Sequence, residues 1–417
     1  MALVSDVPKD SFRLSMLLYD TRYRSLTIQV IVFMLFMAGA AWLVDNTIRN
    51  LEALGKDFSF AFLGQPAGYD ISQRLVEYTS DSTHGRALLI GLLNTLLVAG
   101  LGCVAATFIG VTAGVLRLSK SWIVARLMTI YVEVFRNIPL LLWILLTFAI
   151  FTEVMPAPNA FRGGDASASM LLFDSVALTN RYTAIPDPLF SRSLGDIDII
   201  IFKISLDLLA LVAAVVAGVL ANRALLRRAT RIQEATGDRP TTWWQSLLFL
   251  FAPVLLVLFA LGFHFAYPEL KGFNFVGGTN VSNSLMALGL ALTLYTGAFI
   301  AEVVRAGIQA VSDGQTEAAF ALGLRPGRTM KLVILPQALR VIIPPLISQY
   351  LNLTKNSSLA IAVGYMDLRG TLGGITLNQT GRELECVLLM MLIYLVISLI
   401  ISGVMNIYNA SVKLKER

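Results

Sequence analysis

Eight separate apolar stretches run through this chain of 417 residues, and each is long enough to cross a lipid bilayer as a helix. The hydrocarbon core of a bilayer is about 30 Å thick and needs roughly 20 helical residues. The stretches are continuously apolar rather than alternating, which predicts helices and not barrel strands. They lie at about 28–44, 88–116, 128–151, 197–221, 244–265, 284–304, 341–364 and 386–407. The predicted fold class is therefore an all-α polytopic membrane protein with about eight transmembrane helices.

The composition agrees with a membrane protein and excludes several other classes. Hydrophobic residues make up 56% of the chain and charged residues 14%, whereas an average soluble domain carries about 25% charged residues. The net charge of +6 does not indicate nucleic acid as a partner, because the basic residues cluster at the ends of the apolar stretches. Cys103 and Cys386 lie far apart inside apolar stretches, so neither a metal site nor a redox site is expected.

Lysine and arginine gather on alternate connecting segments, which predicts the orientation of the chain. The segments 117–126, 223–239 and 305–340 are rich in basic residues, as are both termini. In contrast, the segment 153–196 holds three arginines against five carboxylates. The pattern predicts a multi-pass membrane protein with both termini in the cytoplasm. The first stretch, with Ala38-Gly39-Ala40, also permits a cleavable signal peptide, and either alternative leaves the later topology unchanged.

The segment between the sixth and seventh stretches has the character of a structured cytosolic loop. Residues 314–336 read GQTEAAFALGLRPGRTMKLVILP. A short helix is predicted over 315–322, with Glu317 in the first turn at the positive end of the helix dipole. Gly323 can end this helix in the left-handed conformation. Pro326 suits the first turn of a second helix, which Pro336 would end or kink.

The spacing of this loop resembles the signature loop of the membrane subunits of ABC importers. Glu-Ala-Ala is followed after three residues by Gly323, and after nine more by an aliphatic residue, one residue and Leu-Pro. Val333 stands where isoleucine is usual, a conservative change. The resemblance implies that an ATPase subunit docks on Gly314, Gln315, Glu317, Ala318, Ala319, Gly323 and Pro336. The chain has no GK[ST] phosphate loop, so we expect a non-catalytic subunit without a cofactor of its own, whose partner binds ATP.

Further segments narrow the resemblance to the polar amino-acid permeases of ABC uptake systems. They read IYVEVFRNIPLL at 130–141, LYTGAFIAEVVRAGIQAV at 294–311 and LNLTKNSSLAIAVG at 351–364. The extra first span and the insert resemble the larger permease subunits of general L-amino-acid systems. The resemblance implies a five-helix core of the type I importer class, two ATPase subunits, a periplasmic amino-acid-binding protein and a second, different permease subunit.

This resemblance also suggests a division of the chain into four parts. Residues 1–86 would form an N-terminal segment, the first transmembrane helix and an external loop. Residues 87–152 and 282–417 would form the two parts of the permease core, the second with the docking loop 305–340. Residues 153–281 would be an insert with two extra transmembrane helices.

Polar side chains inside the apolar stretches are the candidate substrate path, because an ionisable group in a bilayer is costly and is a functional hypothesis by default. Glu302 with Arg305, and Glu133 with Arg136, are each spaced three apart on one helix face, so each could instead be a structural ion pair. The same two alternatives hold for the remaining candidates, which are Asn94, Asn352, Lys355, Asn356 and Ser357. Lys203 and Asp207, spaced four apart in the insert, are predicted to be a structural pair on one helix.

Two other functional classes are alternatives to the importer permease, and the sequence features that each requires are missing. An amino-acid transporter driven by an ion gradient would use Glu302 and Lys355 as coupling groups. No internal repeat supports this alternative, and such a transporter does not need a docking loop. A membrane-embedded enzyme would need a His/Asp/Ser or metal-binding group, and the sequence shows none. The sequence does not say which amino acids are carried.

Overall fold

The computed structural model describes residues 16–412, except 54, 56, 163–166 and 200–201. The chain divides into two units, Met1–Ala61 and Phe62–Arg417. The first unit contains α1 (Met16–Tyr19) and α2 (Thr21–Ala53). The apolar side chains of α2 are exposed on all sides within its unit, as expected of a helix that lipid surrounds.

Seven helices in the described part of the chain are long and apolar enough to cross a membrane, and an eighth candidate is a pair of helices bent against each other. The seven are α2, α3 (His84–Leu116), α6 (Leu206–Thr236), α7 (Trp243–Ala260), α8 (Asn283–Gln309), the continuous segment Pro326–Val363 and α14 (Glu383–Val412). The prediction of an all-α membrane protein with about eight spans is confirmed. Several of the predicted boundaries are wrong, as described below.

The third predicted span is not a straight helix. α4 (Trp122–Asn137) is bent by 105° from the helical segment Leu140–Val154, which consists of α5 (Leu140–Ala149) and a π turn, η2 (Ile150–Val154). Ile138 adopts an extended conformation at the bend, because the ring of Pro139 disfavours a helical residue before it. The rings of Phe135 and Trp143 stack across the bend with centroids 4.1 Å apart. The span predicted over 128–151 is therefore a pair of helices bent at Pro139.

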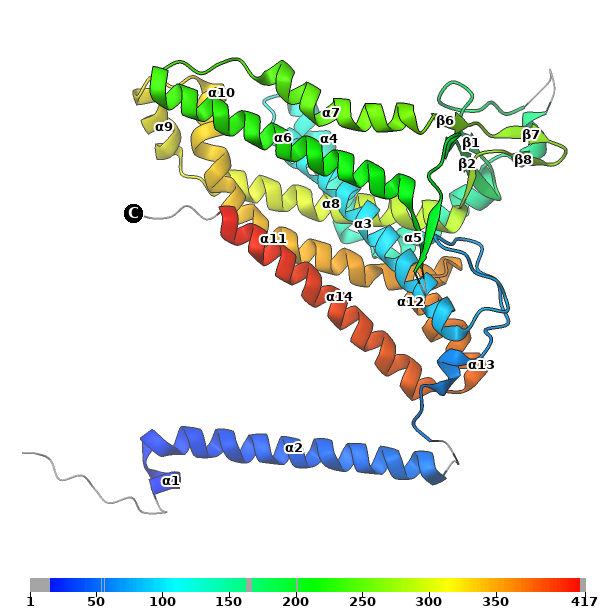
Figure 1. Cartoon of the computed structure of the whole chain (residues 1–417). Helices are drawn as coiled ribbons and strands as arrows, with labels where there is room; N and C mark the ends of the chain where they lie inside the picture. The colour runs from blue at the N-terminus through cyan, green and yellow to red at the C-terminus, as the bar shows by residue number, and fades with distance from the viewer. Residues whose placement is uncertain (1–15, 54, 56, 163–166, 200–201, 413–417) are drawn as a thin grey trace, which may run out of the picture. The chain divides into compact units, whose positions relative to one another are not determined.

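The core of the second unit is built on α3 and α8, which lie side by side (Figure 1). Each helix begins at a hydroxyl cap, Thr83 for α3 and Ser282 for α8. A methyl group added at Gly110 of α3 would lie 2.5 Å from Cβ of Ile300 in α8. A methyl group added at Gly114 would lie 2.7 Å from the carbonyl oxygen of Ala301 in α8. Small residues at a helix contact let two backbones approach, and this geometry is common between membrane helices.

The segment after the docking loop forms one long helical path. α10 (Pro326–Thr329) passes through the π turn η4 (Met330–Ile334) into α11 (Leu335–Asn356). Pro336 is the second residue of α11, so of the two expected effects, an end or a kink, the helix does not end there and is instead distorted by the π turn before it. A proline inside a helix clashes with the carbonyl four residues earlier, and the wider π turn before Pro336 relieves this clash.

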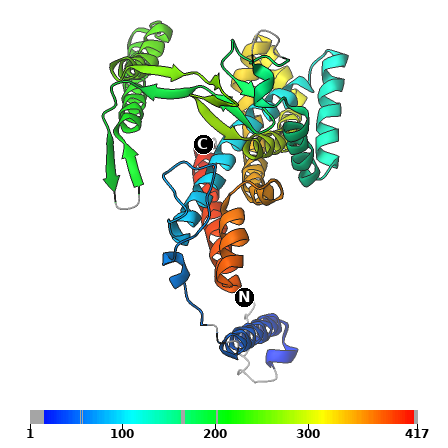
Figure 2. The ribbon, with the colours of Figure 1, turned by 90° about the vertical axis from the view of Figure 1, so that its right-hand side faces the viewer.

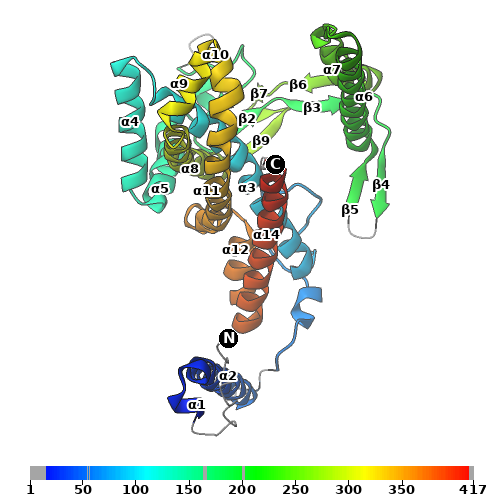
Figure 3. The same ribbon diagram turned by 90° about the vertical axis from the view of Figure 1, so that its left-hand side faces the viewer.

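Short helical segments connect α11 to the last span. They are η5 (Ser357–Val363), α12 (Leu368–Gly370), η6 (Thr371–Thr376) and α13 (Leu377–Thr380). Figure 3 shows α12 beside α14, below the end of α11. α11 and α14 also pack against each other directly.

In its described residues, the segment between α5 and α8 contains nine short strands, none of which was predicted from the sequence. β1 (Ala177–Leu178), β2 (Tyr182–Ile185) and β9 (Thr279–Ser282) form an antiparallel sheet in the order β1-β2-β9. β3 (Asp187–Phe190) pairs with β6 (Phe263–Ala266), β4 (Asp196–Ile199) with β5 (Phe202–Ser205), and β7 (Glu269–Lys271) with β8 (Asn274–Val276).

These strands join the ends of a helical hairpin made of α6 and α7 to the core (Figure 2). Pairing of β2 with β9 and of β3 with β6 brings together chain segments on either side of the hairpin. α6 and α7 pack on each other, with Gly218 of α6 close to the carbonyl of Phe249 in α7. Figure 3 shows β3 and β6 running between this hairpin and the core.

The fourth span differs from its predicted bounds at both ends. Residues 197–199 and 202–205, predicted to be helical, lie in strands β4 and β5, and α6 begins only at Leu206, where Ser205 caps it. Lys203 is therefore in a strand and not one helical turn before Asp207, so the predicted helical pair is wrong. Asp207 instead accepts hydrogen bonds from the Ser193 hydroxyl at 2.6 Å and the Leu194 amide at 2.8 Å.

Candidate functional site

The predicted docking loop folds as a helix, a tight turn and a second helix. Its first helix, α9, spans Asp313–Ala321 and so begins two residues before the predicted start. The carboxylate in its first turn is therefore Asp313, and Glu317 lies one turn later on an exposed face. The expected position of Glu317 in the first turn is wrong, although the helix itself is confirmed.

The turn after α9 depends on Gly323, whose φ is +77°. The Gly323 amide donates to the carbonyl of Phe320 at 2.9 Å, and the Leu324 amide donates to the carbonyl of Ala319 at 3.1 Å. This pair of hydrogen bonds is a Schellman motif, which ends a helix with a left-handed residue. Pro326 then begins α10. The predicted roles of Gly323 and Pro326 in the backbone are confirmed.

The loop presents both small and apolar groups to the outside. Glu317, Ala318 and Gly323 are exposed, whereas Ala319 is buried inside the loop. Around them lie four exposed apolar side chains, which we call the docking patch: Phe320, Leu322, Met330 and Leu332. Apolar groups exposed together are typical of a protein interaction site.

The docking loop is continuous with the transmembrane region. The side-chain amide of Gln337 in α11 donates to Oε1 of Gln315 in α9 at 3.1 Å. Gly314 is the second residue of α9, and Pro336 the second residue of α11. Because η4 joins α10 to α11 without a loop, displacement of the docking helices would move α11 with them.

Near the docking loop, charged residues from α4 and α8 and from the end of α3 form one cluster around Glu302. Arg117, the residue that caps α3, places Nη1 2.5 Å from Oε2 of Glu302. Arg305 donates to Oε1 at 2.8 Å, and Nη1 of Arg136 lies 3.5 Å from Oε2. Glu133 lies 4.0 Å from Arg117. We call these five residues the Glu302 cluster.

The Glu302 cluster contains all four charged residues predicted in the third and sixth spans. Its arrangement favours the structural alternative, because each carboxylate already has a cationic partner. Arg117 completes the cluster, and its side chain is only 7% exposed. From the sequence it was expected to be one of the basic residues of a cytosolic loop. Its position next to an apolar span gave no sign that it folds back onto α8.

Asn94 is also held in structural hydrogen bonds. Its side chain is fully buried and donates to the carbonyl of Gln73 at 2.8 Å and to that of Met366 at 2.9 Å. The neighbouring Thr95 hydroxyl accepts from the Leu368 amide at 3.0 Å. Through these hydrogen bonds, Asn94 and Thr95 hold α3 against the segment before it and against the connection between α11 and α14.

The polar residues of the seventh span do not share one environment. Ser357 is buried and donates to the carbonyl of Thr354, Asn356 is half-buried, and Asn352 is exposed. Lys355 lines a cavity of about 430 Å³ together with Arg369 and residues of α14. Sequence reasoning missed Arg369, which lies outside the eight apolar stretches.

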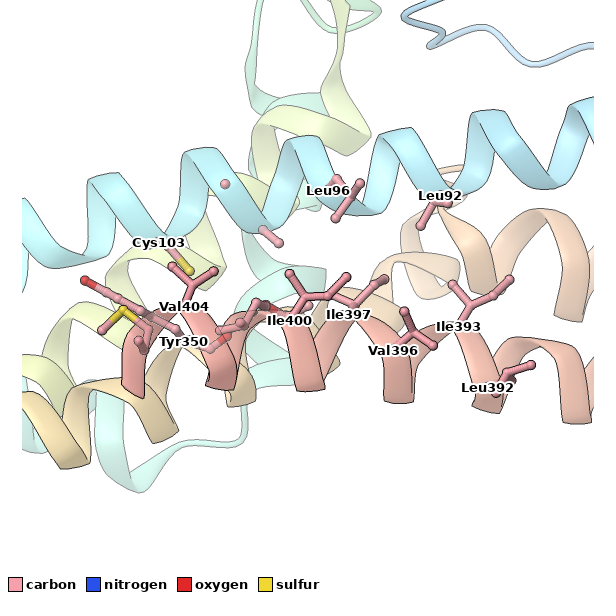
Figure 4. Close-up of a pocket in the computed structure, with 15 residues that line it drawn as sticks. Leu92, Leu96, Cys103, Tyr350, Leu392, Ile393, Val396, Ile397, Ile400 and Val404 are labelled. Atoms are coloured by element: carbon pink, nitrogen blue, oxygen red, sulfur yellow. Dashed lines mark hydrogen bonds between the residues drawn. The ribbon is translucent and has the colours of Figure 1, made fainter. Parts of the chain in front are cut away.

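A second, larger hollow lies between α3 and α14 and is almost entirely apolar. It has a volume of about 730 Å³. Figure 4 shows Leu92 and Leu96 of α3 facing Ile393, Ile397 and Ile400 of α14 across it. A groove with so apolar a lining suits lipid chains or another helix better than a charged amino acid.

Comparison with known proteins decides the family. Residues 106–414 match the model of the binding-protein-dependent transport system inner membrane component. The chain belongs to this family. Membership supports an importer permease and not the secondary transporter considered above, and it implies an ATPase and a binding protein as partners.

Three relatives are similar over almost their whole lengths. The glutamate/glutamine/aspartate/asparagine transport system permease protein BztB of Rhodobacter capsulatus is 64% identical, and the alignment covers 100% of both chains. The general L-amino acid transport system permease protein AapQ of Rhizobium johnstonii is 44% identical over 98% of this chain and 96% of its own. The putative amino-acid ABC transporter permease protein YhdX of Escherichia coli is 42% identical, covering 94% and 95%.

Proposed function

We propose that this permease subunit imports polar L-amino acids of the glutamate, glutamine, aspartate and asparagine group across the bacterial inner membrane, driven by ATP. The observation that carries the substrate group is the 64% identity with BztB over both complete chains. The similarity to AapQ, named for general L-amino acids, supports amino acids as the wider class.

The docking loop supports an ATPase subunit as the source of energy. The exposed Glu317, Ala318 and Gly323, with the docking patch around them, offer a surface on which a second protein can pack. The chain itself lacks a GK[ST] loop to hold ATP phosphates. Binding and hydrolysis of ATP therefore belong to the partner, and this subunit converts the partner's movement into a change of helix positions.

We propose that the movement reaches the membrane through α11. This helix continues directly from the docking helices and carries Lys355 near its other end. The Glu302 cluster joins the ends of α3, α4 and α8 close to the loop, so that these helices move as one group. Alternating access of this kind is largely a rigid-body movement of one group of helices against another.

The complete importer is proposed to contain a second, different permease subunit, two ATPase subunits and a periplasmic binding protein. Both termini of this chain would then lie in the cytoplasm, on the side of the docking loop. The basic residues of the alternate connecting segments support this orientation.

Reconstitution tests the proposal directly. The permease pair and its ATPase are placed in proteoliposomes with ATP inside, and uptake of labelled L-glutamate and L-glutamine is measured with the binding protein outside. We expect uptake that needs enclosed ATP and persists when a protonophore is added. Uptake that stops when the protonophore is added and that does not depend on enclosed ATP would refute the proposal.

A further inference from the structure

The cavity that contains Lys355 lies between the end of α11, the connection that follows it, and one face of α14. Its polar lining consists of Lys355, Ser358, Arg369, Tyr394 and Ser398. Met390, Met391 and Leu395 supply an apolar wall. With a volume of about 430 Å³, the cavity lies in the size range of small-molecule sites.

Two positive charges line this cavity, and no carboxylate does. Within the described part of the chain, neither Lys355 nor Arg369 takes part in an ion pair. Arg369 donates from Nη1 to the carbonyl of Gly373 at 2.5 Å, which leaves its other donors available. Lys355 is exposed and Arg369 is half-buried in this chain, and ionisable residues at membrane depth usually mark the path of a substrate or an ion.

The carboxylate of Asp367 does not neutralise these cations. It is fully buried, accepts from the Gly370 amide at 2.8 Å and lies 3.4 Å from the Tyr394 hydroxyl. Tyr394 therefore stands between Asp367 and the cavity. No carboxylate among the described residues pairs with Lys355 or Arg369, so an anion from outside the chain can balance them.

The position of the cavity along α14 indicates which anion that is. Its lining residues in α14 run from Met390 to Ser398, the eighth to the sixteenth residue of the helix. At 1.5 Å per residue these lie about 10–22 Å from the helix start, near the middle of a hydrocarbon core about 30 Å thick. A phospholipid headgroup lies at the surface of that core, whereas a solute in transit passes through its centre.

We propose that Lys355 and Arg369 form a membrane-embedded site for the carboxylates of an acidic L-amino acid in transit. The site rests on the proposed function and deepens it, because it favours substrates with two carboxylates over their amides. The guanidinium of Arg369 can hold one carboxylate through two parallel hydrogen bonds. Lys355 supplies a second charge for the other carboxylate, and the apolar wall accommodates the methylene groups between them.

The backbone at Gly373 keeps the guanidinium of Arg369 in place. A side chain added at Gly373 would collide with Nη1 of Arg369 and would lie 3.1 Å from the Met390 sulfur. The next residue, Gly374, has room for a methyl group, since its nearest neighbours would be 3.6 Å and 3.7 Å away. The two glycines thus form a matched pair for testing the position of Arg369 without changing a charge.

The test compares uptake of L-glutamate and L-glutamine by reconstituted importers that carry Lys355→Gln or Arg369→Gln. Because the same binding protein serves every variant, its own preference cancels in the ratio of variant to wild type. We expect each substitution to lower the glutamate-to-glutamine ratio about tenfold, the size of one lost charge-assisted contact. Gly373→Ala should lower the ratio, and Gly374→Ala should not.

Controls separate the site from the proposed function. Lys120→Gln removes an exposed positive charge outside the cavity and should leave the ratio unchanged. If wild-type importer carries none of these amino acids, the proposed function fails. If wild type transports and both cavity variants keep its ratio, the site is refuted while the function stands. If the variants keep the glutamate-to-glutamine ratio but their uptake depends differently on phosphatidylglycerol in the vesicles, Lys355 and Arg369 bind a lipid headgroup. That result would also overturn the proposal.

Discussion

The carboxylate of Glu302 in α8 lies 2.5 Å from a guanidinium nitrogen of Arg117, which is 185 residues earlier in the chain. Arg305 and Arg136 approach the same carboxylate from α8 and α4. One acidic group thus joins three helices close to the loop on which the ATPase is proposed to dock. Its removal leaves several cations without their partner.

Glu302→Gln is expected to destabilise the protein because it leaves the nearly buried Arg117 with only the distant Glu133. Breaking a buried pair costs about 3–5 kcal/mol, and partial exposure of Glu302 lowers the expected loss to about 1–3 kcal/mol. Thermal unfolding in detergent measures the change. The double variant with Arg117→Gln should lose less than the sum of the single variants, and additive losses would show that the two residues do not interact.

Gly323→Asp is expected to abolish transport while membrane insertion stays normal. An aspartate at a φ of +77° is strained, and its charge would face the docked ATPase. Co-purification of the ATPase with the permease is the direct measurement. Gly327→Asp is the matched control, because Gly327 is exposed and has no left-handed backbone. Equal loss of ATPase in both variants would mean that charge alone, and not the turn, is responsible.

Gly110→Ala is expected to separate α3 from α8, since the new methyl group would lie 2.5 Å from Cβ of Ile300. Overpacking of a close contact costs about 1–3 kcal/mol. The yield of folded protein after heating in detergent reports the loss. Gly100→Ala in the same helix has no neighbour within 4 Å and should be neutral, so a similar loss there would point to the helix itself instead of the contact.

The local features of the docking loop could be predicted from sequence because each depends on neighbouring residues. Gly323 ends α9 as expected, since only glycine adopts a left-handed backbone without strain. Pro326 begins α10 for a similarly local reason. For Pro336 the sequence permitted either an end or a kink, because the π turn that accommodates the proline is not visible in the hydrophobic pattern.

The strands of the insert and the size of the bend at Pro139 escaped prediction for a different reason. The apolar run at 197–221 contains both a strand hairpin and the start of α6, and short apolar runs do not distinguish the two. The bend follows from the conformation of Ile138 before Pro139, but its angle of 105° also reflects packing of α5 on α8.

By itself the sequence determined the membrane class, the number of spans and the docking loop, because hydrophobicity, charge bias and helix-ending residues act over a few turns of chain. Only the tertiary structure decided what the polar residues do. It placed Arg117 on Glu302 and Arg369 beside Lys355, and it buried Asn94 among backbone carbonyls. These contacts join residues far apart in sequence, and the cost of burying a charge or an amide depends on the partner that folding brings to it.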